Sequence, residues 1–188
     1  RQASALRQPL LEPEHPLVAT SLNNLAVVLH RQGRLDEAEA LNRQALALRQ
    51  RRLGVGHPDV AISLSNLASA LDSQGKLTAA ESLYRQALEL RKKQLGPEHP
   101  DVAQSLSNLA YVLSRQGRMS EAEALHRQVL ALRQKQLSPM HPMIAFSLVN
   151  MAMLYLRQGI PTQALLLLQQ AVQIHEVQVR NTVSETRT

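Results

Sequence analysis

Apolar residues recur at intervals of three and four along the chain, which is the spacing that places them on one face of an α-helix. In the segment that follows Pro58, the stripe consists of Val60, Leu64, Leu67 and Leu71. In a second kind of segment, richer in Ala and Leu, it consists of Ala38, Leu41, Ala45 and Leu48. The pattern predicts pairs of amphipathic helices. The first helix of a pair begins at proline, which suits a first helical turn, and ends at glycine.

The whole pattern repeats every 42 residues without insertion or deletion. His-Pro occurs at His15, His57, His99 and His141. An Asn in an Asn-Leu-Ala or Asn-Met-Ala triplet occurs at Asn24, Asn66, Asn108 and Asn150. A fixed period of this length is typical of a repeat array, in which each unit is one supersecondary element stacked on its neighbours. The sequence therefore predicts an all-α solenoid.

The landmarks also set the boundaries of the repeats. Residues 1–14 resemble the second helix of a preceding repeat, because Arg1-Gln2-Ala3 precedes His15 by the interval at which Arg85-Gln86-Ala87 precedes His99. A short, degenerate capping helix is the alternative for this segment. We expect four repeats, at 15–56, 57–98, 99–140 and 141–180, and a flexible tail at 181–188, which is polar and has no period.

Both ends of the second helices carry polar signals. A capping box is predicted at their start from the pairs Asp36/Glu39, Thr78/Glu81 and Ser120/Glu123. Their last turns are basic, as at Arg49, Arg91 and Arg133. Cations there complement the negative end of the helix dipole, and we favour this role over a nucleic-acid-binding stripe.

These motifs resemble the tetratricopeptide repeat, in the 42-residue form found in kinesin light chain and nephrocystin. The residues that carry the resemblance are Leu22-Asn23-Asn24-Leu25-Ala26, and Asn66-Leu67-Ala68 with Leu71, Gly75, Ala80, Tyr84 and Ala87. The resemblance implies a right-handed superhelical solenoid of antiparallel helix pairs that binds proteins and catalyses no reaction. It also implies that the first helices line a concave groove.

The amino-acid composition limits the chemical classes of partner that we expect. The net charge of +6 favours acidic partners. Aromatic residues make up 2% of the chain and basic residues are dispersed, so we expect no nucleic-acid partner. No segment has the pattern of a signal peptide or a membrane span, and we expect no membrane insertion. The absence of Cys fits a reducing compartment, so we expect a cytoplasmic protein.

Seven histidines and several acids raise the question of catalysis or metal binding. The four His-Pro histidines fall at equivalent turns of successive repeats and do not converge, so they are expected to cap helices and not to bind a metal. The chain has no glycine-rich phosphate loop, no Ser/His/Asp set and no His-Glu-x-x-His. We expect no enzyme activity and no cofactor.

Candidate binding residues lie on the predicted first helices. Asn disfavours helix interiors, so Asn24, Asn66, Asn108 and Asn150 at one register need an explanation. The resemblance implies contact with a peptide backbone, and a hydrogen bond to the neighbouring repeat is the alternative. Further along come Arg31, Arg115 and Arg157, which suit carboxylates or a solvated helix end. Apolar candidates on the same face are Tyr111, Met153 and Phe146. We predict binding of an extended, acidic peptide in this groove.

The fourth repeat departs from the others. Leu165 and Leu168 stand where the first repeat has Glu39 and Asn42. The solvent face of its second helix is therefore expected to be apolar, and these leucines are candidates for self-association. This feature supports the alternative function, a structural, assembly or regulatory segment that packs on its own chain or on another copy.

Overall fold

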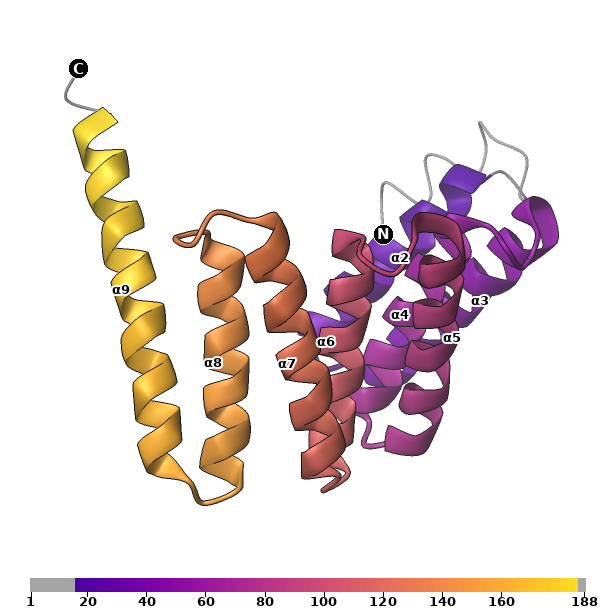
Figure 1. Ribbon diagram of the computed structural model, residues 1–188. Helices are drawn as coiled ribbons and strands as arrows, with labels where there is room; N and C mark the ends of the chain where they lie inside the picture. The colour runs from indigo at the N-terminus through magenta and orange to yellow at the C-terminus, as the bar shows by residue number, and fades with distance from the viewer. Residues whose placement is uncertain (1–15, 186–188) are drawn as a thin grey trace. The chain divides into compact units, whose positions relative to one another are not determined.

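The computed structural model describes residues 16–185, and the side chains of residues 17–180. This range is helical throughout, apart from short turns, and contains no strand (Figure 1). Its helices are α2 (Pro16–Arg31), α3 (Leu35–Leu53), α4 (Pro58–Ser73), α5 (Leu77–Leu95), α6 (Pro100–Arg115), α7 (Met119–Gln136), α8 (Pro142–Arg157) and α9 (Pro161–Glu185). The prediction of an all-α fold is confirmed.

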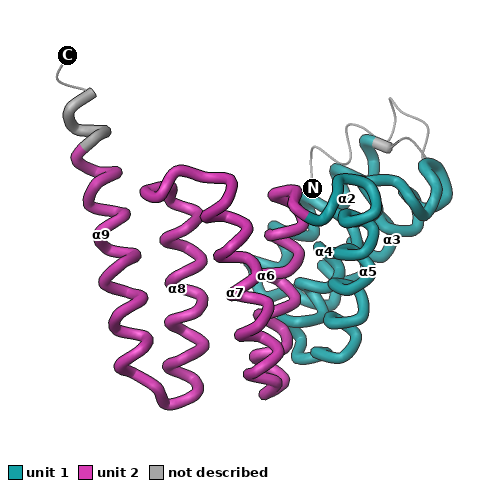
Figure 2. The backbone as a smooth tube through the Cα atoms, viewed as in Figure 1, with its two compact units in different colours: residues 1–97 teal, residues 98–188 magenta. Residues whose placement is uncertain are grey.

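The chain forms two compact units, residues 1–97 and 98–188 (Figure 2). In unit 1, α2 packs on α3, α3 on α4, and α4 on α5. In unit 2, α6 packs on α7, α7 on α8, and α8 on α9. The described residues of each unit therefore form two helix pairs, and within a unit the second helix of one pair packs on the first helix of the next. The remnant helix expected at residues 1–14 lies outside the described residues, as does His15.

The His-Pro motifs begin the first helices. The Nδ1 atoms of His57, His99 and His141 accept a hydrogen bond from the backbone N–H two residues later, at 3.2, 3.1 and 3.1 Å. The proline that follows each His occupies the first helical position. The expected capping role of these three histidines is confirmed.

The second helices do not begin with a capping box, so that prediction is wrong. Their N-cap residues are Arg34, Lys76 and Arg118, and none of these side chains caps its helix. The preceding glycine explains the shift: Gly75 has φ +78° and turns the chain so tightly that Leu77 is already helical. Thr78 and its equivalents therefore lie one residue inside the helix.

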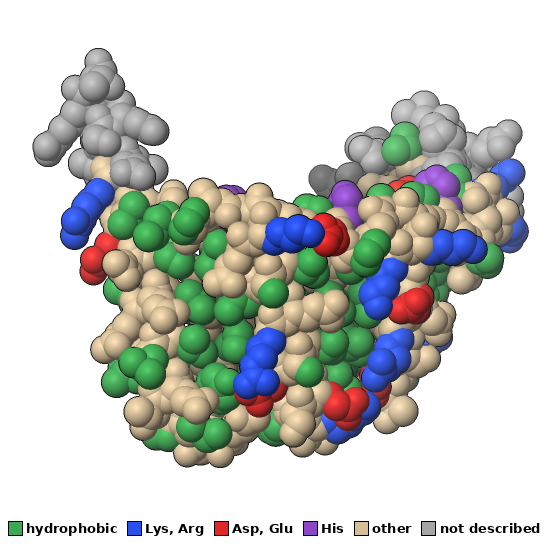
Figure 3. Space-filling model, viewed as in Figure 1, with side chains coloured by type: hydrophobic (Ala, Val, Ile, Leu, Met, Phe, Trp, Pro, Cys, Tyr) green, Lys and Arg blue, Asp and Glu red, His purple; other side chains and the backbone are tan. Residues whose placement is uncertain are grey.

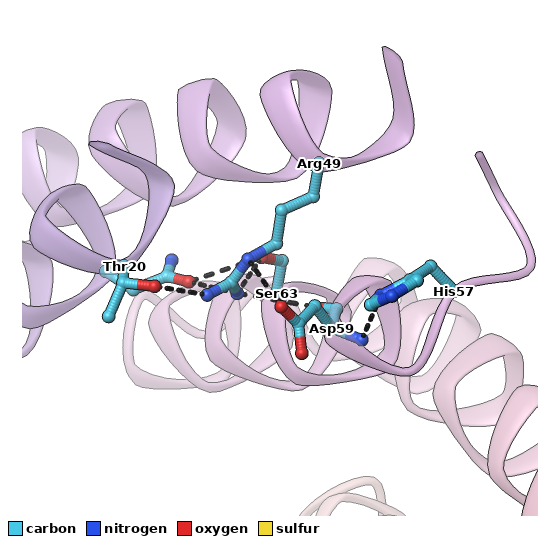
Figure 4. Close-up of polar contacts among 6 residues, drawn as sticks. Thr20, Arg49, His57, Asp59 and Ser63 are labelled. Atoms are coloured by element: carbon cyan, nitrogen blue, oxygen red, sulfur yellow. Dashed lines mark hydrogen bonds and ion pairs between the residues drawn. The ribbon is translucent and has the colours of Figure 1, made fainter. Parts of the chain in front are cut away.

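The basic residues at the ends of the second helices are not all solvated, as Arg49 shows. Arg49 is 5% exposed, and its guanidinium lies between α3, α2 and α4 (Figure 4). Its Nη1 atom donates to Asn23 Oδ1 at 2.8 Å and to Ser63 Oγ at 2.7 Å, and its Nη2 atom donates to Thr20 Oγ1 at 3.1 Å. The Asp59 carboxylate lies 4.0 Å from Nε. Arg49 thus joins two successive helix pairs, which a role at the helix dipole alone does not describe.

The last helix is longer than expected. We expected a flexible tail from residue 181, whereas α9 continues to Glu185. Each of the other second helices stops shortly before a glycine or a proline: α3 before Gly54, α5 before Gly96 and α7 before Pro139. The equivalent residues of α9 are Arg180 and Asn181, so neither a left-handed glycine nor a proline ends the helix there.

Candidate functional site

Unit 2 contains a cavity of about 310 Å³ between its two first helices. Helices α6 and α8 form the walls, and α7 contributes one side chain. The lining residues are Gln104, Ser107, Asn108, Tyr111, Ser114, His126, Phe146, Asn150, Met153, Leu154 and Arg157. None of them is an acid. We call this the unit 2 cavity.

Six of the candidate groove residues meet at this cavity: Asn108, Tyr111, Phe146, Asn150, Met153 and Arg157. Tyr111, Phe146 and Met153 are about half exposed, so their apolar surface faces the open side of the cavity. The remaining candidate of unit 2, Arg115, is exposed at the end of α6 and is not among the lining residues. The spacing of residues along the first helices thus identified most of the lining.

Arg157 is held over the wall of the cavity by two contacts. Its Nη1 atom donates to Ser114 Oγ at 3.0 Å, which joins α8 to α6. Its guanidinium carbon lies 5.9 Å from the centre of the Tyr111 ring, within the range of a cation–π interaction. The cation therefore has a fixed position while much of it stays open to a ligand.

His126 is one of five lining residues that the sequence analysis missed, with Gln104, Ser107, Ser114 and Leu154. It lies on α7, is 5% exposed and lines the cavity, and its ring has no hydrogen-bond partner among the described residues. Burial, reinforced by the charge of Arg133, lowers the pKa of His126 to about 4. The ring is therefore neutral near pH 7, with one nitrogen able to accept and the other able to donate.

A signal for His126 was present in the repeat register. The equivalent position holds Asn42 in the first repeat, Tyr84 in the second and Leu168 in the fourth. A position that changes chemistry in every repeat, beside positions that do not, is a candidate for repeat-specific contacts. The candidate binding residues in the sequence analysis lie on the first helices, whereas His126 lies on a second helix.

Arg133 is a buried cation next to His126. It is 4% exposed, and its Nη1 atom donates to Ser147 Oγ at 2.7 Å and to the Met143 carbonyl at 3.2 Å. Its guanidinium carbon lies 5.9 Å from the centre of the Phe146 ring. Burial lowers the pKa of Arg133. The equivalent Arg49 has a carboxylate 4.0 Å away, on Asp59, but the residue at that register in the fourth repeat is Met143.

Unit 1 has a smaller cavity, of about 140 Å³, at the equivalent place between α2 and α4. The candidates Arg31 and Asn66 line it, whereas Asn24 is exposed on α2 and is not among the lining residues. Asn42 takes the place of His126 here. Its side chain accepts from Asn23 Nδ2 at 2.9 Å and donates to the Asn66 carbonyl at 3.2 Å. At this position the side chain of Asn42 is therefore hydrogen-bonded, unlike that of His126 in the unit 2 cavity.

The four register asparagines do not link neighbouring repeats through their side chains within the described part of either unit. Asn108 Oδ1 accepts from Gln104 Nε2 at 3.0 Å, a contact along α6 itself. Asn66 takes part in an inter-helix contact, but through its backbone carbonyl. Asn150 is half-buried in the cavity wall. The amides of Asn108 and Asn150 thus lie at the cavity, where a ligand backbone would meet them.

The apolar face of α9 is formed differently from the prediction. Leu165 is 56% exposed, as expected. Leu168 is half-buried and packs against the cluster of Met151, Tyr155 and Ala164, so it does not belong to an open solvent face. Its side chain fills space inside the fourth repeat instead. Leu166 and Val172, at 56% and 55% exposed, extend the apolar surface, and Figure 3 shows hydrophobic side chains over this part of unit 2.

Two properties of the described residues bear on other classes of function. No group of three or more His, Asp or Glu side chains there is arranged to hold a metal ion. None of the helices has the length and hydropathy that crossing a membrane requires.

The tetratricopeptide repeat family model matches residues 1–51, 23–93, 59–135 and 101–176, so the chain belongs to the tetratricopeptide repeat family. Within it, the chain is similar to solved structures of the kinesin light chain type. The crystal structure of a putative kinesin light chain from Podosopora anserina, with nearly identical TPR-like repeats, is 31% identical, with a TM-score of 0.75 over 93% of this chain and 82% of that one. A variant of it gives 31% identity and a TM-score of 0.79 over 95% and 84%.

The crystal structure of BtubC (BKLC) from P. vanneervenii is 25% identical, with a TM-score of 0.78 over 92% of this chain and 69% of that one. No curated protein matches the sequence. These comparisons confirm the resemblance to 42-residue tetratricopeptide repeats and the predicted fold class. Repeats of this family are protein–protein interaction modules, which is the class of function the fold defines.

Proposed function

We propose that unit 2 binds an acidic peptide segment at the cavity between α6 and α8. The observation that supports this most is the charge of the site: Arg157 and the neighbouring buried Arg133 are cationic, and no acidic side chain lines the cavity. A carboxylate can take forked hydrogen bonds from a guanidinium. The net charge of +6 adds a general attraction for acidic segments.

The uncharged polar side chains supply the second part of recognition. Asn108 and Asn150 can each donate to and accept from a peptide backbone, whatever its side chains. Tyr111, Phe146 and Met153 offer apolar surface to the methylene groups of the ligand. In this proposal the amides hold an extended backbone, and the arginines select acidic over basic segments. The binding is reversible, and no chemical step is part of it.

A titration with model peptides tests the proposal. The probes are acetylated, amidated hexaglutamate and hexalysine, added to fluorescently labelled protein at pH 7.5. We expect hexaglutamate to bind, hexalysine not to bind, and the affinity for hexaglutamate to fall with added salt, because exposed charges are screened. Arg157→Glu should weaken binding strongly, and Arg43→Glu, at an exposed position on α3 of unit 1, serves as the matched charge control. Equal binding of both peptides would refute the proposal.

We also infer a second function, self-association through α9, from the register of its exposed residues. Leu46 and Leu130, the equivalents of Val172, pack against the first helix of the following repeat. Glu123, the equivalent of Leu165, accepts a hydrogen bond from that helix as well. Leu165 and Val172 thus occupy the stacking register, with apolar side chains that are more than half exposed.

Sedimentation velocity over a range of concentrations tests this second function. The wild type should form a concentration-dependent oligomer through a second copy of the chain, and Leu165→Glu combined with Val172→Glu should give a monomer. The matched control is Gln169→Glu, an exposed polar position on the same helix. A wild type that stays monomeric at every concentration would rule out self-association.

A further inference from the structure

Two features, one in the lining of the unit 2 cavity and one behind it, are not explained by binding of a neutral peptide. His126 is 95% buried, since 5% of it is exposed, yet its ring has no hydrogen-bond partner among the described residues. The ring nitrogens are not among the fully buried unpaired atoms of the described residues, so they are reached from the cavity, where a ligand can complete their hydrogen bonds. Arg133 adds a buried positive charge whose contacts in the described chain are neutral oxygens and an aromatic ring.

The comparison with unit 1 shows that both features are particular to unit 2. The floor residue of the unit 1 cavity, Asn42, makes two hydrogen bonds. The buried Arg49 has the Asp59 carboxylate near its Nε. In unit 2, His126 replaces the bonded Asn at the cavity, and Met143, outside the lining, replaces the counter-ion. The site therefore has an excess of positive charge and an unused ring nitrogen.

We propose that a ligand carboxylate enters the unit 2 cavity and that His126 takes up a proton from solvent as the carboxylate binds. This inference rests on the proposed function. The carboxylate stays ionised, and the imidazole becomes an imidazolium that donates to it. A glutamate side chain suits this cavity, because its methylene groups can contact Met153 and Phe146 while its head reaches the ring. A chain-terminal carboxylate has the same head group and is the other source.

The surroundings of His126 explain why the ligand controls the proton. On α7, Arg133 opposes protonation, while Glu123 is bound by Arg127 and by Tyr155 of α8. From α8, Arg157 adds a second positive charge, and the lining residues of α6 are uncharged near pH 7. Burial and Arg133 hold the pKa of the free ring at about 4. A carboxylate against the ring reverses this balance, because an opposite charge favours the charged form.

The consequence is an affinity that rises as the pH falls. If the ring in the complex regains the ordinary pKa of a histidine, about 6.5, the affinity should increase about tenfold between pH 7.5 and pH 5.5. Over this range glutamate remains mostly ionised, since its ordinary pKa is about 4.3. A site that recognised carboxylates through arginine alone would show no such increase.

Calorimetric titration with acetylated, amidated hexaglutamate tests the proposal on the full chain. Titrations at pH 5.5 in two buffers of different ionisation enthalpy should report uptake of about one proton per peptide bound. Acetylated hexaglutamine with a free C-terminal carboxylate, compared with acetylated, amidated hexaglutamine, tells whether a chain terminus can supply the group. The ring signal of His126, assigned by its loss in His126→Asn, should titrate at a higher pH in the complex than in the free protein.

Two variants introduce the residue that another repeat has at the equivalent position, so the fold should tolerate them. His126→Asn, which copies Asn42 of the first repeat, should abolish both the proton uptake and the pH dependence. Met143→Asp, which copies Asp59 of the second, should supply Arg133 with a counter-ion and weaken hexaglutamate binding several-fold. If hexaglutamate binds but without proton uptake, the inference fails while the proposed function stands. If it does not bind at either pH, both fail. The titration of the His126 signal in the wild type decides the matter, and a variant is needed only to assign that signal.

Discussion

Tyr155 donates its phenolic hydroxyl to Glu123 Oε1 at 2.7 Å, and so joins the first helix of the fourth repeat to the second helix of the third. Arg127 donates to the same oxygen from one helical turn away. The hydrogen bond to Glu123, together with burial, raises the pKa of Tyr155. A polar contact therefore supports the stacking of α8 on α7, close to the cavity that these helices help to form.

Removing this hydroxyl should destabilise unit 2 modestly. Tyr155→Phe keeps the ring in the core, while Glu123 keeps Arg127 as a partner. We expect the free energy of unfolding to fall by about 1 kcal/mol, the net contribution of one hydrogen bond. Urea denaturation followed by circular dichroism measures it, with Tyr111→Phe, at an exposed ring, as the control. An equal effect of both variants would show that the Glu123 contact contributes nothing.

Arg49 should matter more for stability than the cations beside it. Arg49→Met removes the hydrogen bonds to Asn23, Ser63 and Thr20, which join two helix pairs, and should lower the free energy of unfolding by roughly 2 kcal/mol or more. Arg51→Met, two residues on and exposed, should change it by less than about 0.5 kcal/mol. Thermal and urea unfolding of both variants measure the difference. Similar effects would mean that Arg49 acts only through its charge.

The stability of unit 2 should depend on pH through His126. The pKa of this ring is about 4 in the folded protein and about 6.5 in an unfolded chain. Below pH 6.5 the unfolded chain therefore binds a proton that the folded unit does not. Stability is unaffected by His126 above that pH and falls as the pH drops from 6.5 to 4, by on the order of 3 kcal/mol in all.

Urea denaturation at pH 7.5, 5.5 and 4.5 measures this dependence. Other groups also titrate in this range, so His126→Asn is the necessary control. The wild type should lose more stability than the variant between pH 7.5 and 4.5. Arg133→Met should raise the pKa of His126, because it removes a positive charge from beside the ring. Parallel pH profiles for the wild type and His126→Asn would contradict the account of a neutral, desolvated ring.

The sequence predicted the features that depend only on residues within a single repeat. The His-Pro caps and the turn glycines depend on residues adjacent in the chain, so His57 and Gly75 could be interpreted locally. The first-helix register also predicted much of the cavity wall, because Tyr111, Asn150 and Met153 face one side of their helices. Residues related by a fixed period share an environment, and this allows such inferences.

Features made by contacts between repeats could not be predicted in the same way. Arg49 has the sequence pattern of a solvated helix end, and its burial depends on Ser63, 14 residues further on in the next repeat. The importance of His126 depends on the cavity walls from two other helices. The capping-box pattern at Thr78 was deceptive, since the tight turn at Gly75 starts the helix earlier. At these positions, the role suggested by neighbouring residues in the sequence differs from the role that contacts in the folded chain define.

The central claim is that an acidic ligand occupies the unit 2 cavity, and methionine methyl NMR tests it most directly. The chain has five methionines, of which Met153 lines the cavity and Met119 begins α7 outside its lining. On titration of methyl-labelled protein with amidated hexaglutamate at pH 5.5, the Met153 signal should shift and saturate while that of Met119 stays in place. An unmoved Met153 signal, or an equal shift of Met153 with hexalysine, would contradict the account.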